Sequence, residues 1–266
     1  MECCCAPIPN PDTSPCPVTL NVPEIIAELD RLLNAGRLND ASQHLALFRE
    51  KAHECGDWRA ELSMMSEQLG LCRRTNDAAL AEECVNSVQQ ILTEHRMNDT
   101  VSGATVLLNA ATTLKCFGEA ERSMPIFRHV ARVYSANLDP ADYRIAGLYN
   151  NMALSYADLG SYEEAERHFE LALLTVSKTT NPGNDLAVTY CNMAEMYYAQ
   201  NSEDARIEQC LDRAYESLCA EGLPHDGYHA FTLSKCIPCF DKHGFFLYAK
   251  ELRERMDGIN RRLKNL

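Results

Sequence analysis

Apolar side chains recur at helical spacing along most of the chain, and the clearest run is the segment 149–172. Its first half places apolar residues at intervals of three and four, as one face of a helix requires: Tyr149, Met152, Ala153 and Tyr156. Gly160 follows and can adopt the left-handed backbone conformation that ends a helix. The second half forms another apolar face with Ala165, Phe169 and Ala172. The segment therefore predicts two helices that pack against each other through small and aromatic residues.

Similar segments recur at a nearly constant period. Pro140, Pro182 and Pro224 are spaced by 42 residues (182 − 140 = 42 and 224 − 182 = 42), and each precedes an apolar-periodic run. Corresponding runs begin upstream at Leu107 and downstream at Tyr190 and Leu233. A fixed period of this size indicates stacked copies of one supersecondary unit.

The outer copies follow the same template less regularly. The first contains Ile25, Leu29, Leu32, Gly36, Leu38, Ala41, Leu45 and Phe48, and the last contains Leu233, Cys236, Phe240, Gly244, Phe246, Ala249 and Met256. The second copy pairs Leu62, Met65, Ser66 and Leu69 with Ala81, Val85 and Val88. This alignment needs three extra residues (81 − 62 = 19 against 165 − 149 = 16), which we expect in the turn 75–77. The pattern predicts six helix pairs.

The order aromatic, large apolar, small, aromatic, Gly, aromatic, small, aromatic, small in 149–172 resembles a tetratricopeptide repeat. The period near 42, with a proline in the connection, resembles the longer repeats of kinesin light chains. The resemblance implies an all-α fold, a right-handed superhelical solenoid of antiparallel helix pairs. We expect this solenoid to span 23–266.

The segment 1–22 has a different composition from the rest of the chain. It is rich in proline and contains Cys3, Cys4, Cys5 and Cys16, so we expect an extended or disordered tail. It shows no charged start followed by an apolar core, and no long apolar run occurs elsewhere, so neither a secretory signal nor a membrane span is predicted. We therefore interpret the 13 cysteines as free thiols of a cytoplasmic protein rather than a disulfide framework.

One cysteine cluster has two interpretations. On a helix, Cys236, Cys239 and His243 would share a face and could bind a soft metal ion, or the two cysteines could act as a dithiol. The simpler interpretation, which we favour, is that Cys236 packs in the core, because the repeat requires an apolar residue there. Pro238 within this segment predicts a kink or a late helix start.

Other function classes find little support in the sequence. No Gly-rich phosphate loop, nucleophile elbow or zinc-protease helix motif occurs, so we predict a protein that is not an enzyme and has no cofactor. Glu163, Glu164 and Glu166 fall in the first turn of a predicted helix, where carboxylates favour the helix dipole and face water. The net charge of −13 argues against nucleic-acid binding, and the basic residues between Lys250 and Lys264 are expected to solvate the last helix.

Candidate binding residues follow from the resemblance, which implies that the residue before the large apolar position faces a concave groove. That residue is asparagine in three consecutive copies, namely Asn109, Asn151 and Asn192. Amide side chains can pair with the backbone of an extended peptide whatever its sequence. Further candidates for the groove are Thr112, Asn150, Leu154, Glu195, Tyr198 and Lys235. The basic residues of a carboxylate-binding groove are replaced by Leu108, Asn150 and Cys191, which disfavours binding of acidic C-terminal tails.

The sequence thus predicts a scaffold or adaptor that binds a protein or an extended peptide, with no nucleic-acid or membrane partner. One alternative is a peptide-sensing regulator that changes conformation when its ligand binds. The other is a metal- or thiol-dependent protein that uses the cluster around Cys236 and Cys239.

Overall fold

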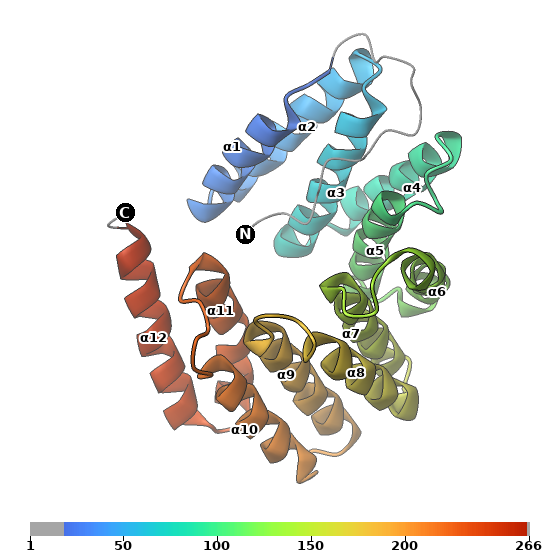
Figure 1. Ribbon diagram of the computed structural model, residues 1–266. Coiled ribbons are helices and arrows are strands. Elements are labelled where there is room, and N and C mark those ends of the chain that lie inside the picture. The colour runs from blue at the N-terminus through green and yellow to red at the C-terminus, as the bar shows by residue number, and fades with distance from the viewer. Residues whose placement is uncertain (1–18, 265–266) are drawn as a thin grey trace. The chain divides into compact units, whose positions relative to one another are not determined.

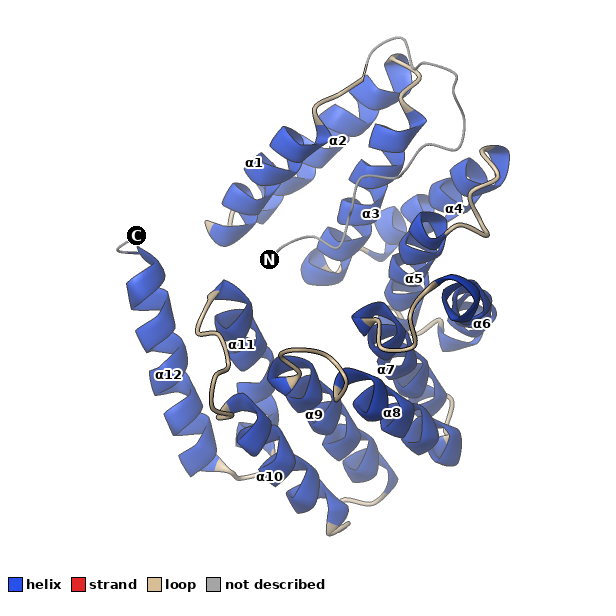
Figure 2. Ribbon diagram, in the orientation of Figure 1, coloured by secondary structure: helices blue, strands red, loops and turns tan. Residues whose placement is uncertain are grey.

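The computed structural model describes residues 19–264, and every regular element in that range is a helix (Figures 1 and 2). Six helices lie in the first half of the chain: α1 (Val22–Asn34), α2 (Leu38–Glu54), α3 (Trp58–Thr75), α4 (Ala78–Glu94), α5 (Val101–Cys116) and α6 (Ala120–Asn137). Six lie in the second half: α7 (Tyr143–Asp158), α8 (Tyr162–Val176), α9 (Gly183–Gln200), α10 (Arg206–Leu218), α11 (Gly227–Lys242) and α12 (Phe246–Lys264). The predicted tail, with Cys3, Cys4, Cys5 and Cys16, lies outside the described residues apart from its last few positions.

These helices form two compact units, and the division falls between Asn137 and Leu138. In the N-terminal unit α1 packs against α2, α3 against α4, and α5 against α6. In the C-terminal unit the pairs are α7 with α8, α9 with α10, and α11 with α12. We call the odd-numbered helices first helices and the even-numbered ones second helices. First helices of neighbouring pairs also pack together, α3 with α5, α7 with α9, and α9 with α11.

Residues in the left-handed conformation mark the turn within four of the pairs at the repeat period or a multiple of it. Asn76, Gly118 and Gly160 have φ values of 56°, 83° and 73° and are spaced by 42 residues (118 − 76 = 42 and 160 − 118 = 42). Gly244, with φ of 83°, lies two further periods on (244 − 160 = 84). An asparagine therefore takes the place of glycine in the second pair. Asparagine adopts the left-handed conformation more readily than most residues other than glycine.

The predicted insertion at 75–77 is wrong. Thr75 ends α3, Asn76 is its cap, and Asp77 caps α4 through its side chain, so the turn is as short as those of the regular copies. The correct register places Met65, Gln68, Leu69 and Cys72 at the positions of Tyr149, Met152, Ala153 and Tyr156. All four side chains are buried. A polar residue, Gln68, at the position expected to be large and apolar concealed this register.

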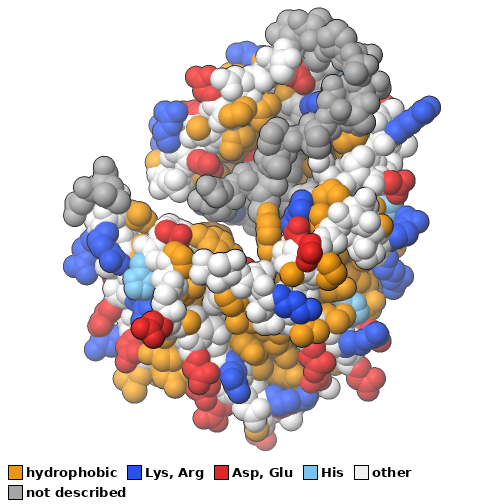
Figure 3. Space-filling model, viewed as in Figure 1, with side chains coloured by type: hydrophobic (Ala, Val, Ile, Leu, Met, Phe, Trp, Pro, Cys, Tyr) orange, Lys and Arg blue, Asp and Glu red, His pale blue; other side chains and the backbone are white. Residues whose placement is uncertain are grey.

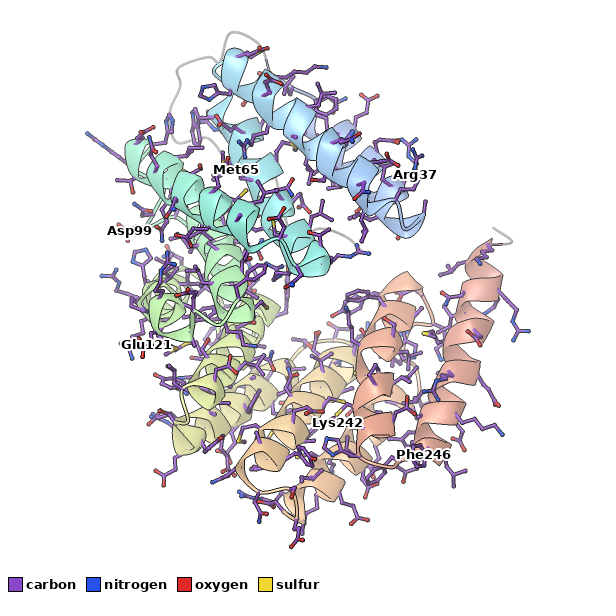
Figure 4. All side chains as sticks on the ribbon, turned by 180° about the vertical axis from the view of Figure 1, so that it is seen from behind. Arg37, Met65, Asp99, Glu121, Lys242 and Phe246 are labelled. Atoms are coloured by element: carbon purple, nitrogen blue, oxygen red, sulfur yellow. The ribbon has the colours of Figure 1, made fainter. Side chains whose placement is uncertain are left out.

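The apolar positions of the template form the core. Phe127, Phe169 and Phe240 are fully buried, and Cys236 is also buried, as the repeat pattern predicted. Cys191 and Cys210 are buried as well. Phe246 is the exception, because its side chain is 67% exposed at the start of α12 (Figure 4). Its neighbour Phe245 is half-buried and packs against the Tyr248 ring at 5.7 Å. The predicted core position of Phe246 is therefore wrong.

Helix α11 is longer than the proline within it suggested. It begins at Gly227, with the Asp226 side chain accepting a hydrogen bond from the His229 amide, and continues through Pro238 to Lys242. The predicted late start at Pro238 is therefore wrong. None of the helices in 19–264 combines the length and apolar character that a membrane crossing requires.

Candidate functional site

The residues predicted to line a groove all lie on first helices, but they belong to two units. Asn109 and Thr112 are on α5 of the N-terminal unit. The others occupy α7, α9 and α11 of the C-terminal unit: Asn150, Asn151, Leu154, Asn192, Glu195, Tyr198 and Lys235. Each of the nine side chains is at least partly exposed. The C-terminal unit thus holds most of the candidate surface, and we describe it by itself.

Amide groups connect neighbouring first helices in this unit. Asn192 on α9 donates from Nδ2 to Oδ1 of Asn150 on α7 at 3.1 Å. Asn151 instead donates from Nδ2 to the Gly147 carbonyl of its own helix at 2.9 Å. The N-terminal unit repeats the first pattern, since Asn109 Nδ2 donates to the Ser66 hydroxyl on α3 at 3.0 Å. Two of the three predicted asparagines therefore also join one repeat to the next, a role that the sequence argument did not include.

A charged cluster lies where α9 meets the end of α11. Glu195 accepts hydrogen bonds from the Lys242 ammonium group and from Nε2 of His243, the latter at 3.3 Å. Burial raises the pKa of Glu195, but the hydrogen bond and charge of Lys242 outweigh it and lower the pKa below its usual value. The Tyr198 ring completes the cluster, with Lys242 Nζ 4.7 Å from its centroid and the His243 ring edge-on at 4.9 Å. Lys242 and His243 were absent from the predicted surface.

Aromatic and apolar side chains flank these polar groups. Lys235 Nζ lies 5.3 Å from the centroid of the Phe231 ring, which is 38% exposed. Tyr228 is 44% exposed and donates from its hydroxyl to the Asp185 carboxylate on α9 at 2.7 Å. Leu154 packs against the core from α7. Such a mixture of exposed aromatic rings, amides and one aliphatic side chain is typical of protein-binding surfaces.

Three buried cysteines lie close to the charged cluster, Cys191 on α9 and Cys236 and Cys239 on α11, and the Cys239 thiol donates to the Cys191 backbone carbonyl at 3.8 Å. The neighbouring thiols of Cys236 and then Cys239, together with burial, raise the pKa of Cys191 well above the usual value. The sequence grouped Cys236 and Cys239 with His243. The structure instead brings Cys239 and His243 together with Glu195, and the three ligand atoms lie within 4.8 Å of one another. Cys236 and Cys239 are both buried, which disfavours the dithiol interpretation.

Ion pairs between second helices were also missed by the sequence argument. Glu166 on α8 accepts from Arg206, the first residue of α10, at 3.2 Å and from the Tyr197 hydroxyl at 2.7 Å, so it does more than face water. Glu82 and Arg122 form the same kind of bridge in the N-terminal unit at 2.9 Å. Both pairs span 40 residues and lie two periods apart (166 − 82 = 84 and 206 − 122 = 84). A search for opposite charges about one repeat apart would have found them.

Two surface hollows lie elsewhere. One of about 310 Å³ lies between the start of α9 and the end of α10 and is lined by residues such as Pro182, Leu186 and Leu223. Another of about 270 Å³ lies over α4 and α5 beside Arg122. Neither includes any of the predicted groove residues.

Comparison with known proteins identifies the repeats. Residues 144–219, which span α7 to α10, match the family model of the tetratricopeptide repeat. The chain contains tetratricopeptide repeats. The resemblance drawn from 149–172 is therefore confirmed. The all-α fold, which is similar to known solenoid structures, is confirmed as well. The right-handed superhelix and the number of helix pairs stay predictions. No curated protein sequence matches the chain.

Solved structures extend the likeness over most of the chain. A putative kinesin light chain from Podosopora anserina, with nearly identical tetratricopeptide-like repeats, is 13% identical with a TM-score of 0.51, and the alignment covers 77% of this chain and 97% of the other. A substituted variant of that protein gives the same identity and coverage with a TM-score of 0.52. BtubC from P. vanneervenii is 16% identical over 93% of this chain and 94% of its own, with a TM-score of 0.45. At these identities the likeness concerns the fold. Tetratricopeptide repeats generally serve as scaffolds for protein interaction.

Proposed function

We propose that the chain is a non-enzymatic scaffold or adaptor that binds an extended peptide segment of a protein across its first helices. The observation that carries the proposal is the row of partly exposed amides on α7 and α9, in which Asn150 and Asn192 are already held side by side. An extended peptide offers alternating N–H and C=O groups, and carboxamides can satisfy both.

The contacts described above use only part of the hydrogen-bonding capacity of these amides. Each carboxamide has two N–H donors and an oxygen with two lone pairs. Asn192 uses one donor on Asn150, and Asn151 uses one donor on the Gly147 carbonyl. These bonds fix the side-chain orientation before a ligand arrives, which lowers the entropic cost of binding. The neighbouring Tyr198 ring, 40% exposed, adds apolar area at the same surface.

We propose that the protein is located in the cytoplasm. Its partner is a protein rather than a nucleic acid or a membrane. The nine cysteines in the described part of the chain are all unpaired, in keeping with a reducing compartment. The formal charge of −13 repels phosphate backbones. Lys and Arg side chains gather along α12, but Glu and Asp side chains are interspersed over the rest of the same face (Figure 3).

The test compares amides on first and second helices. The native partner is captured from lysate by the parent chain, identified, and its binding segment is made as a peptide for titration. Asn151→Ala removes an amide whose hydrogen bond is to the Gly147 carbonyl of the same helix, so helix packing is preserved. We expect it to weaken peptide binding several-fold, as the loss of a hydrogen bond worth about 1 kcal/mol implies.

The matched control is Gln209→Ala, which removes an exposed amide from the second helix α10. It should leave the affinity unchanged. Equal affinities of the parent, Asn151→Ala and the triple variant of Asn109, Asn151 and Asn192 would rule out this surface. A ligand-dependent change in radius of gyration would instead favour the sensing regulator over a passive scaffold.

A further inference from the structure

Two pairs of potential metal ligands face each other across α9 and α11. Cys191 and Glu195 are four residues apart on α9, and Cys239 and His243 are four residues apart at the end of α11. Residues four apart lie on one face of a helix. The two pairs are offset by the same number of residues (239 − 191 = 48 and 243 − 195 = 48). Because α9 packs against α11, each ligand of one pair lies next to its counterpart in the other.

The contacts between the pairs bring three of the four side chains together. The Cys239 thiol donates to the Cys191 backbone carbonyl at 3.8 Å, and the ligand atoms of Glu195, Cys239 and His243 lie within 4.8 Å of one another. Nε2 of His243 lies 3.3 Å from Oε1 of Glu195. Cys239 is 8% exposed and the His243 side chain 5%, whereas the Glu195 side chain is 37% exposed. The cluster is therefore buried on the thiol side and open to solvent on the carboxylate side.

We propose that α9 and α11 together bind one zinc ion through Glu195 of α9 and through Cys239 and His243 at the end of α11. Zinc takes four ligands in a tetrahedron at about 2.0–2.3 Å, which separates neighbouring ligand atoms by roughly 3.3–3.8 Å. The distance between His243 and Glu195 falls in this range, and the three ligand atoms of Glu195, Cys239 and His243 lie within 4.8 Å of one another. A water molecule at the solvent side would complete the shell of four. Thiolate and imidazole ligands favour zinc over magnesium or calcium.

The ion would have to displace a cation that already occupies part of the site. Lys242 donates to Glu195 in the present arrangement (its place is labelled in Figure 4). Its ammonium group lies at the solvent side and is 47% exposed, so it can turn away into water. Zinc would then take over its role of neutralising Glu195 and would fasten the pair α9–α10 to the pair α11–α12. Glu195 belongs to both proposed sites, whereas Cys239 and His243 belong to the metal site alone.

Cobalt titration of the full chain tests the proposal. The protein is kept reduced, and Cys3, Cys4, Cys5 and Cys16 are changed to Ser so that the tail thiols contribute no signal. We expect one equivalent of Co²⁺ to bind with a thiolate-to-cobalt charge-transfer band and intense visible bands of tetrahedral geometry. One equivalent of Zn²⁺ should abolish both and raise the melting temperature.

Variants identify the ligands. Cys239→Ser should remove the charge-transfer band and weaken binding by roughly tenfold or more, because a hydroxyl is a poor ligand for a soft ion. Glu195→Gln keeps the shape of the side chain and should also weaken binding. Lys242→Ala should tighten binding several-fold, since it removes the competing cation. The control Cys84→Ser changes a cysteine buried in the N-terminal unit and should leave the titration unchanged.

Three results would overturn the proposal. They are the absence of a stoichiometric cobalt band in the folded parent, a band that survives Cys239→Ser, and a chain purified under reducing conditions in which Cys239 is oxidised to a disulfide with Cys191. Circular dichroism of each variant separates loss of a ligand from loss of the fold.

Discussion

Two phenylalanines that the repeat template treats alike have opposite environments. Phe169 on α8 is fully buried and shares a core cluster with Ala153 of α7 and Ala187 of α9, whereas Phe246 is 67% exposed. We expect Phe169→Ala to lower the free energy of unfolding by about 3–5 kcal/mol, because it leaves a large cavity. Phe246→Ala is the matched control and should change it by less than about 0.5 kcal/mol. Urea denaturation measures both, and equal losses would contradict the burial described above.

A buried histidine links α11 to α9. His229 is fully enclosed, and its Nδ1 lies 2.7 Å from Oδ1 of Asn184, an arrangement in which Nδ1 donates. Nε2 has no hydrogen-bond partner among the described residues. Protonation of Nε2 would bury an unpaired positive charge near His225 and Arg255. Burial first, and then these two neighbours, lower the pKa of His229 to about 4, against a smaller opposing effect of Asp226.

This lowered pKa predicts a loss of stability in weak acid. Because the unfolded chain protonates His229 near pH 6.5 and the folded chain only near 4, the folded state loses stability as the pH falls through that interval. We expect His229 to account for about 1–2 kcal/mol between pH 7 and pH 5. The His229→Gln variant should show a smaller decrease in melting temperature over the same interval. A decrease equal to that of the parent would exclude His229 as its source.

At the scale of the helix, ion pairs one repeat apart join successive second helices. The Glu166 and Arg206 side chains are 35% and 42% exposed, so water screens their attraction. A double-mutant cycle with Glu166→Gln and Arg206→Gln should therefore give a coupling energy of about 0.5–1 kcal/mol at low salt. The equivalent Glu82–Arg122 pair, whose side chains are 45% and 46% exposed, should give a somewhat smaller value. A coupling that is zero in both pairs, or that is unaffected by salt, would refute this account.

Much of the helical architecture could be predicted from the sequence, because its repeated unit buries the same positions each time. Pro140, Pro182 and Pro224 located three connections, and Gly160 located a turn that recurs at Gly118. The second pair was misaligned because Gln68 stands where the pattern expects a large apolar residue, so that a register shifted by three residues matched the pattern better. The left-handed Asn76 decides between them.

The candidate site was less predictable, since it depends on contacts between helices rather than along one. Asn150 and Asn192 were both expected on the surface, but their mutual hydrogen bond requires the packing of α7 against α9. The same holds for Glu195, which was predicted as a groove residue without its partners Lys242 and His243. One repeat period of spacing, with some allowance for helix ends, relates all these pairs and is the signal that sequence analysis could have used.

At the scale of the whole molecule, stability in a repeat protein comes from each helix pair and its nearest neighbours. The chain divides after Asn137 into two compact units, each with its own buried core. Leu92 on α4 and Leu211 on α10 are both fully buried, one in each unit. They therefore form a matched pair with which to test how far a local defect spreads.

We expect Leu92→Ala and Leu211→Ala each to cost about 2–5 kcal/mol, and chiefly in the unit that contains the change. Native-state hydrogen exchange measures the protection of each helix separately. Leu92→Ala should accelerate exchange in α3 to α6 more than in α7 to α12, and Leu211→Ala should do the reverse. Uniform acceleration over all helices by either variant would mean that the chain unfolds as one cooperative body. In that case the ends of the predicted binding surface would be coupled in stability, and a ligand on α7 and α9 would also protect the helices of the N-terminal unit.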